Sequence, residues 1–82
     1  MSGLIKRSFS LAGHRTSVAL EPAFWDALYE IAQYRGMSLG GLVVSVDSGR
    51  DGTTALASAL RVLALREALG RASQRPLGPP HP

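Results

Sequence analysis

The segment His14-Arg15-Thr16-Ser17-Val18-Ala19-Leu20 runs through Glu21-Pro22 directly into a series of apolar residues with helical spacing. Polar or small residues alternate with apolar ones along this segment, which is typical of a half-buried β-strand. Because successive side chains of a strand point to opposite faces, every second residue shares a face. The outward face then carries Arg15, Ser17 and Ala19.

A single strand leaves its rows of backbone N–H and C=O groups unpaired, and even an isolated hairpin is marginal in water. The simplest supplier of a partner strand is an identical chain lying antiparallel across a two-fold axis. Residues 1–11 form an extended or flexible arm, and the sequence leaves open whether this arm pairs with the strand as a hairpin or extends it. We therefore expect an obligate homodimer whose strands form an intermolecular antiparallel β-ribbon.

Three helices are expected after the strand. The first begins at Pro22, whose missing N–H is tolerated in a first turn, and ends at Gly36. The second begins with Ser38 as N-cap, although residues 42–46 could also pass for a buried strand. The third is capped by Thr53 or Thr54 and ends at Gly70.

The expected fold is thus mostly α-helical with one short N-terminal β-strand. It has an arm over residues 1–11, a domain over residues 12–70, and a disordered proline-rich tail over residues 71–82. The third helix carries a broad apolar surface, which again favours a dimer core.

Composition excludes several classes of protein. The 82 residues contain no cysteine, and the two histidines lie at opposite ends, which argues against disulfides and a Cys/His metal site. No apolar run approaches the roughly 20 residues that span a bilayer, and no secretory signal is evident. No catalytic constellation can be assembled, and residues 36–41 lack the lysine of a nucleotide-binding loop. We expect a soluble cytoplasmic protein that is not an enzyme, with no cofactor, metal or small-molecule substrate.

Charge is unevenly distributed along the chain. Residues 1–20 carry three cations and no acid (+3), residues 21–60 sum to −3, and residues 61–82 sum to +3. Positive charge near the strand suits a polyanion such as nucleic acid, although ordinary surface charge is the more common origin of such asymmetry.

The order of strand, helix, tight glycine turn and helix resembles the ribbon-helix-helix DNA-binding proteins, and within them a bacterial subfamily with an extra C-terminal helix. The resemblance covers roughly residues 6–67. The segments that carry it are Lys6-Arg7-Ser8, Gly13-His14-Arg15-Thr16-Ser17-Val18, Leu20-Glu21, Phe24-Trp25, Arg35-Gly36-Met37-Ser38-Leu39 and Ser58-Ala59-Leu60-Arg61.

This resemblance implies that the ribbon enters the DNA major groove and that Arg15, Ser17 and Ala19 contact bases. Arg15 can donate two hydrogen bonds to guanine, Ser17 discriminates weakly, and Ala19 offers only a methyl group. The family also holds a phosphate at the start of the second helix, here Ser38, Leu39 and Gly40, although Ser38 could be a cap alone.

Further phosphate contacts could come from Lys6, Arg7 and His14. The plain alternatives are a solvated terminus for the first two residues and a turn-stabilising role for His14. Trp25 is read as a core aromatic residue rather than a platform for stacked bases.

The leading hypothesis is a homodimer that binds double-stranded DNA at the nucleoid as a transcriptional regulator of the repressor type; the sequence leaves open whether dimers pair into tetramers on DNA. The alternative hypothesis is a protein-interaction or dimerisation module of the same fold without DNA binding.

Overall fold

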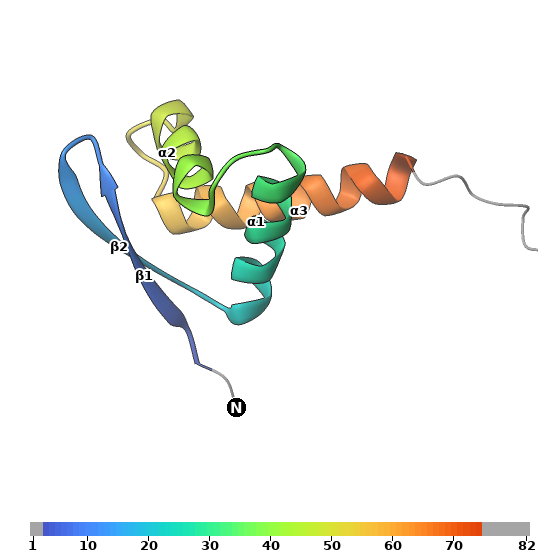
Figure 1. Ribbon diagram of the computed structural model, residues 1–82, viewed down its shortest axis with the longest axis horizontal. Helices are drawn as coiled ribbons and strands as arrows, with labels where there is room; N and C mark the ends of the chain where they lie inside the picture. Colours follow the sequence, from blue (N-terminus) through green and yellow to red (C-terminus); the bar gives the residue numbers. More distant parts are fainter. Residues whose placement is uncertain (1–2, 75–82) are drawn as a thin grey trace, which may run out of the picture.

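The computed structural model describes residues 3–74, which form a two-stranded antiparallel sheet followed by three helices. The strands are β1 (Ile5–Leu11) and β2 (His14–Leu20), and the helices are α1 (Pro22–Tyr34), α2 (Leu39–Gly49) and α3 (Leu56–Gln74). The helices pack on one face of the hairpin and leave its other face open (Figure 1).

Residues before β2, rather than another chain, supply its first partner strand. β1 and β2 pair from Ile5 opposite Leu20 to Leu11 opposite His14, which leaves a loop of two residues. Ala12 and Gly13 both have positive φ, at 51° and 82°, as a type I′ hairpin turn requires. The arm expected over residues 1–11 is therefore largely a strand, and the expected single strand is corrected to two.

The core lies between the inner face of the hairpin and the three helices. Each helix contributes an apolar stripe, as helical spacing of apolar residues predicts. Trp25 on α1 is only 3% exposed and is a core residue, as expected. The largest fully buried side chains are Leu20, Leu28, Ile31, Leu42, Val43 and Leu60.

The boundaries of α1 and the start of α2 follow from local signals. Pro22 opens α1, and Gly36 with a φ of 70° ends it, where the Met37 N–H bonds to the Ala32 carbonyl oxygen at 2.9 Å. Residues 42–46 are helical, because the Ser38 hydroxyl oxygen accepts a hydrogen bond from the Gly41 N–H at 2.9 Å and starts α2 ahead of them.

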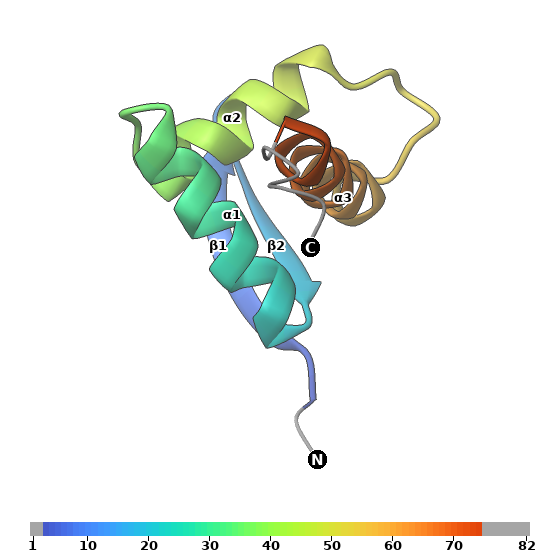
Figure 2. The same ribbon diagram turned by 90° about the vertical axis from the view of Figure 1, so that its right-hand side faces the viewer.

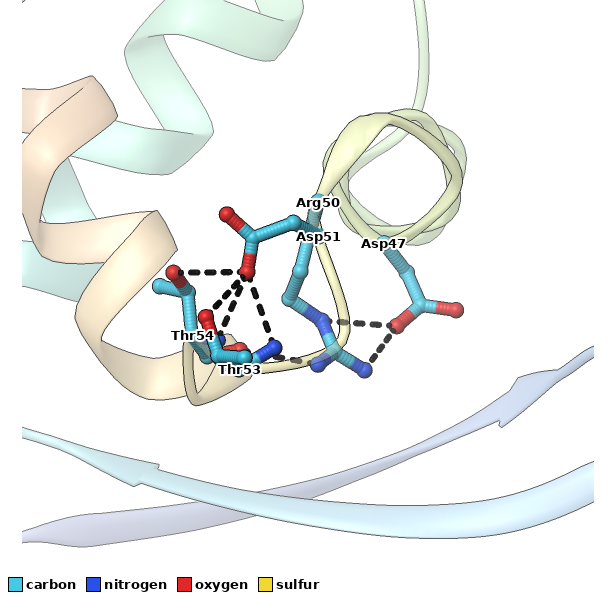
Figure 3. A network of polar contacts seen from close by, with 5 residues as sticks. All are labelled: Asp47, Arg50, Asp51, Thr53 and Thr54. Carbon is cyan, nitrogen blue, oxygen red and sulfur yellow. Dashed lines mark hydrogen bonds and ion pairs between the residues drawn. The ribbon is translucent and has the colours of Figure 1, made fainter.

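A polar network closes the loop between α2 and α3 (Figure 3). Arg50 donates from Nε and Nη2 to Asp47 Oδ1 at 3.2 and 2.7 Å, and from Nη1 to the Thr54 carbonyl oxygen at 2.8 Å. Asp51 Oδ1 accepts hydrogen bonds from the backbone N–H groups of Thr53 and Thr54 at 2.8 and 3.1 Å. The two threonines therefore belong to a turn held by Asp51.

Both ends of α3 differ from the expected ones. The helix begins at Leu56, because Thr53 and Thr54 are occupied in the preceding turn. It passes Gly70 and continues to Gln74, since one glycine costs only about 1 kcal/mol relative to alanine and its neighbours are good helix formers. Arg71 also ties this last part to Glu30 of α1, with 3.6 Å between the charged groups. Residues 75–82 of the expected tail lie outside the described part.

Among residues 3–74, no helix is both long and apolar enough to cross a membrane.

Candidate nucleic-acid interface

The open face of the hairpin brings together one polar set of side chains. Cross-strand pairing places Lys6 opposite Ala19, Ser8 opposite Ser17 and Ser10 opposite Arg15, all on the face away from the helices. All but Ala19, which is half-buried, are exposed. We call these six residues the outward face.

The chemistry of the outward face is cationic and hydroxylic. Lys6 and Arg15 lie near its opposite ends, and neither has an ion-pair partner among residues 3–74. Ser8 Oγ and Ser17 Oγ lie 3.1 Å apart at its centre. The face contains no carboxylate, so it is suited to an anionic ligand with hydrogen-bonding edges.

Sequence reasoning singled out Arg15, Ser17, Ala19 and Lys6 but not Ser8 or Ser10. The missed signal is the alternation within residues 5–11, where Phe9 and Leu11 turn toward the core. Had the arm been read as a strand, this alternation would have placed both serines beside the predicted base-reading residues.

Arg7 does not share the face of its neighbour Lys6. Its side chain lies on the helix side of the sheet, where the guanidinium carbon is 5.5 Å from the centre of the Trp25 ring. The Trp25 indole N–H donates to the Ile5 carbonyl oxygen at 2.8 Å, and the Phe9 ring centre is 5.9 Å away. This cluster fastens β1 to α1.

The start of α2 lies near this cluster. Leu39 lines a hollow of about 320 Å³ together with Arg7, Trp25, Asp26 and Tyr29. The backbone N–H groups of Leu39 and Gly40 have no hydrogen-bond partner within residues 3–74, as is usual in a first helical turn. The structure thus brings Arg7 beside the helix start, but Asp26 adds a negative charge to the same hollow.

The remaining predicted contact residues occupy simpler positions. His14 is exposed and closes the hairpin opposite Leu11, next to the turn. Ser38 is an N-cap whose hydroxyl oxygen is already bound by Gly41. These positions agree with the structural alternatives to phosphate binding, which were a turn-stabilising role for His14 and a helix cap for Ser38.

Glu21, the first acid after the strand, is turned toward α3. Its Oε1 accepts hydrogen bonds from Nε and Nη2 of Arg61 at 3.1 and 2.9 Å. A backbone hydrogen bond at Glu21 and the hydrogen bonds from Arg61 hold the pKa of this carboxyl below its ordinary value of 4.5. The charge of Glu21 is therefore engaged beside α3, and the outward face keeps its positive character.

Residues 3–74 contain no group of three or more potential ligands that could hold a metal ion.

Comparison with known proteins places this geometry in a family. The chain matches none of the curated proteins compared. It is similar to a solved structure, an uncharacterized protein from Bordetella pertussis Tohama I, with 33% identity and a TM-score of 0.76. The match covers 95% of this chain and 66% of that one. The sequence pattern of the family described as a ribbon-helix-helix domain matches residues 4–68. The chain, with its hairpin ribbon followed by helices, therefore belongs to the ribbon-helix-helix domain family.

Proposed function

We propose that this protein binds double-stranded DNA through the outward face of its hairpin and acts as a transcriptional regulator, of the repressor type. The observation that carries the proposal is the outward face itself, an exposed ribbon with a cation near each end and no acid. A β-ribbon is one of the two elements of secondary structure that the major groove admits.

The residues of this face have different roles in the proposal. Arg15 donates to guanine O6 and N7, a pair that contributes about 1–3 kcal/mol of discrimination between bases. Ser17 offers one hydroxyl, and Ala19 offers a methyl contact to thymine. Specificity therefore depends mainly on Arg15, and affinity depends on phosphate contacts.

Phosphate contacts come from Lys6 on the same face and from the first turn of α2. There the free N–H groups of Leu39 and Gly40 and the positive end of the helix dipole favour an anion. Arg7 and His14 are secondary candidates, since Arg7 is held over Trp25 and His14 lies at the turn. Such binding weakens steeply as salt is raised.

The proposed assembly is a homodimer, which allows a tetramer on tandem sites. A symmetric dimer doubles both the cations and the base-reading residues, and its natural target is a palindromic site. The proposed location is the cytoplasm, at the nucleoid when DNA is bound.

The test is selection of bound sites from a randomised duplex library, followed by fluorescence anisotropy at several salt concentrations. On the best site, Arg15→Ala should lower affinity about 5- to 150-fold and relax specificity. The matched control is Arg66→Ala, which removes an exposed arginine on α3, also without an ion pair among residues 3–74. If no duplex is bound in a salt-dependent manner, or if both variants weaken binding equally, the proposed function is wrong.

A second candidate is a dimerisation or protein-interaction module that does not bind DNA. An apolar groove between α1 and α3, lined by residues such as Phe24, Ala27, Val62 and Leu65, favours it. This function predicts association that survives Arg15→Ala, with no binding to any duplex in the selection.

A further inference from the structure

A polar hollow lies where the C-terminal half of α3 passes the end of α1, and we call it the Tyr34 hollow. Its volume is about 310 Å³, and it is lined by Tyr34 of α1 and by Arg66, Glu67, Gly70 and Arg71 of α3. This half of α3 extends away from the hairpin (Figure 1), and seen from its C-terminal end the hairpin lies behind the helices (Figure 2). A duplex held by the outward face is therefore remote from the Tyr34 hollow.

Gly70 is a glycine that the fold of α3 does not require. It lies inside a helix, where glycine is less favourable than alanine, and its φ is not positive, unlike that of Gly36. A Cβ at position 70 would meet no heavy atom within 4 Å among the described residues, so no neighbour requires a small residue. A longer side chain here would stand in the Tyr34 hollow, so the glycine keeps the hollow open.

Two arginines supply positive charge to the Tyr34 hollow. Arg66 is exposed and has no ion-pair partner within residues 3–74. Arg71 is held loosely, because its Nη1 lies 3.6 Å from Glu30 and its side chain is 44% exposed. A guanidinium group presents a planar fork of N–H donors that matches the oxygen atoms of a phosphate. Both arginines therefore have donors available for an anionic ligand.

The carboxylate that lines the Tyr34 hollow is already engaged. Glu67 Oε2 accepts a hydrogen bond from Arg35 Nη2 at 3.1 Å. Arg35, Arg66 and Arg71 stand against only two carboxylates in this cluster, Glu67 and Glu30, so one positive charge is in excess. The electrostatics of the hollow therefore favour an anion.

Tyr34 adds an aromatic ring to these cations. Its side chain is 82% exposed, so the ring does not belong to the core. The guanidinium carbon of Arg71 lies over the ring, 5.6 Å from its centre, and this covers one of the two faces. The other face can stack on a planar ring of a ligand, as aromatic side chains stack on nucleobases.

We propose that the Tyr34 hollow binds a mononucleotide, with the phosphate group between Arg66 and Arg71 and the base stacked on Tyr34. The volume of about 310 Å³ lies at the lower end of the range of small-ligand sites, which is about 300–1,000 Å³, so the hollow suits one nucleotide rather than a strand. The proposal goes beyond the proposed function, and neither depends on the other.

Isothermal titration calorimetry of the full chain tests the site, with adenosine monophosphate, adenosine and inorganic phosphate as probes. Adenosine monophosphate should bind with a dissociation constant below about 1 mM, because it uses both the ring and the cations. Adenosine and inorganic phosphate each use one part of the site and should bind at least about tenfold more weakly. Adenosine monophosphate should also raise the melting temperature, since it binds the folded chain.

Substitutions of the lining residues separate the two parts of the site. Arg66→Ala should weaken the binding of adenosine monophosphate and of phosphate about tenfold. Tyr34→Ala should weaken adenosine monophosphate about 5- to 150-fold and leave phosphate unchanged, because only the base is stacked. Lys6→Ala is the matched control for charge, since it removes an exposed cation of the outward face that also lacks an ion pair among residues 3–74.

Gly70→Leu distinguishes a ligand site from a structural role of the glycine. Leucine is a better helix former, so the free protein should melt about 4 °C higher than the wild type. The added side chain fills the hollow, so the affinity for adenosine monophosphate should fall at least about tenfold. Ala72→Leu is the control, because it adds leucine at an exposed position of the same helix that does not line the hollow.

The outcomes are separate from those of the duplex selection. Binding that is weakened by Gly70→Leu, Arg66→Ala and Tyr34→Ala, but not by Ala72→Leu or Lys6→Ala, supports the nucleotide site even if no duplex is bound. The site is overturned if adenosine monophosphate does not bind up to about 10 mM, if a lining variant leaves its affinity unchanged, or if the controls lose as much affinity as the lining variants. Any of these results overturns the site even if duplex binding is intact.

Discussion

Trp25 fastens the first strand of the hairpin to α1 by a buried ring and a hydrogen bond, and replacing it with phenylalanine tests this contact. The indole N–H bonds to the Ile5 carbonyl oxygen at 2.8 Å, 20 residues away in the sequence. Phenylalanine keeps an aromatic ring near Phe9 but cannot donate this hydrogen bond.

The expected loss of stability has two parts. A neutral hydrogen bond contributes about 0.5–1.5 kcal/mol, and its removal leaves a partly buried carbonyl without its partner. The smaller ring also leaves space at a site that is only 3% exposed, which adds a cavity cost of similar size. We expect Trp25→Phe to lower the free energy of unfolding by about 2 kcal/mol, or the melting temperature by about 10 °C for a domain of this length.

Circular dichroism melts at one fixed protein concentration measure this change, and hydrogen exchange locates it. Amides of β1 should exchange faster relative to those of α2 and α3, because the hairpin loses its tie to α1. Tyr29→Phe is the control, since the Tyr29 hydroxyl is exposed and accepts only a 3.4 Å hydrogen bond from Gln33. The reasoning would be refuted by a Trp25→Phe protein that melts within about 2 °C of the wild type. It would also be refuted if the β1 amides of this variant kept their protection against exchange.

Three other perturbations address the site and its surroundings. Gly40→Ala should raise the free energy of unfolding, measured in thermal melts, by up to about 1 kcal/mol, because the added Cβ meets no atom closer than 4.0 Å. If a phosphate approaches this turn, the variant should also bind duplexes more weakly, and unchanged affinity would remove that contact from the proposal. Lys6→Ala should weaken binding to all duplexes alike and reduce the slope of log affinity against log salt concentration by about one. A loss of affinity that depends on the DNA sequence, like that expected for Arg15→Ala, would contradict a phosphate role. The pKa values of Glu21 and Asp51 are lowered, so the stability that these carboxylates contribute is complete above the pKa values of the unfolded chain and is lost as pH falls through the lower folded values. Melting temperatures should therefore drop below about pH 4.5, and Asp51→Asn should make this drop smaller; a flat profile from pH 7 to 3 would count against both contacts.

Elements defined by local signals were predictable from the sequence. Pro22 at the first turn and Gly36 just past the last turn bound α1, and the Ser38 cap distinguishes a helical from a strand reading of residues 42–46. These signals depend on backbone chemistry within a few residues, so no tertiary information is needed. The ribbon-helix-helix fold, which the order of elements and the resemblance to that family predicted, is confirmed.

The pairing of β1 with β2 could not be decided in the same way. Intramolecular and intermolecular pairing satisfy the same backbone groups, so the pattern of a strand does not choose between them. The turn was also a weak signal, because Ala12 has a positive φ that alanine rarely adopts, in place of the asparagine or aspartate common in such turns. The position of Arg7 on the helix side of the hairpin could not be predicted either, since alternation assigns a side chain to a face only after its segment is recognised as a strand.

The end of α3 shows a different limit. Gly70 is a reasonable stop signal, but its cost is small against contacts made on both sides of it. Arg35 bonds to Glu67 at 3.1 Å and Arg71 reaches Glu30, so two ion pairs hold the C-terminal turns against α1. Such contacts join residues more than thirty positions apart and are not visible in a local pattern.

The hairpin changes why this chain would form a dimer. A lone strand requires a second copy simply to satisfy its backbone, and folding, association and the DNA-facing surface would then stand or fall together. Here β1 already satisfies one edge of β2, and the inner face of the hairpin rests on its own core. In the proposed homodimer, association therefore rests on surfaces other than the paired edge of β2, such as the apolar groove between α1 and α3. The outward face is formed within one chain, so in the proposed function its phosphate contacts can persist when association is lost, whereas the doubling of base-reading residues by a second copy cannot.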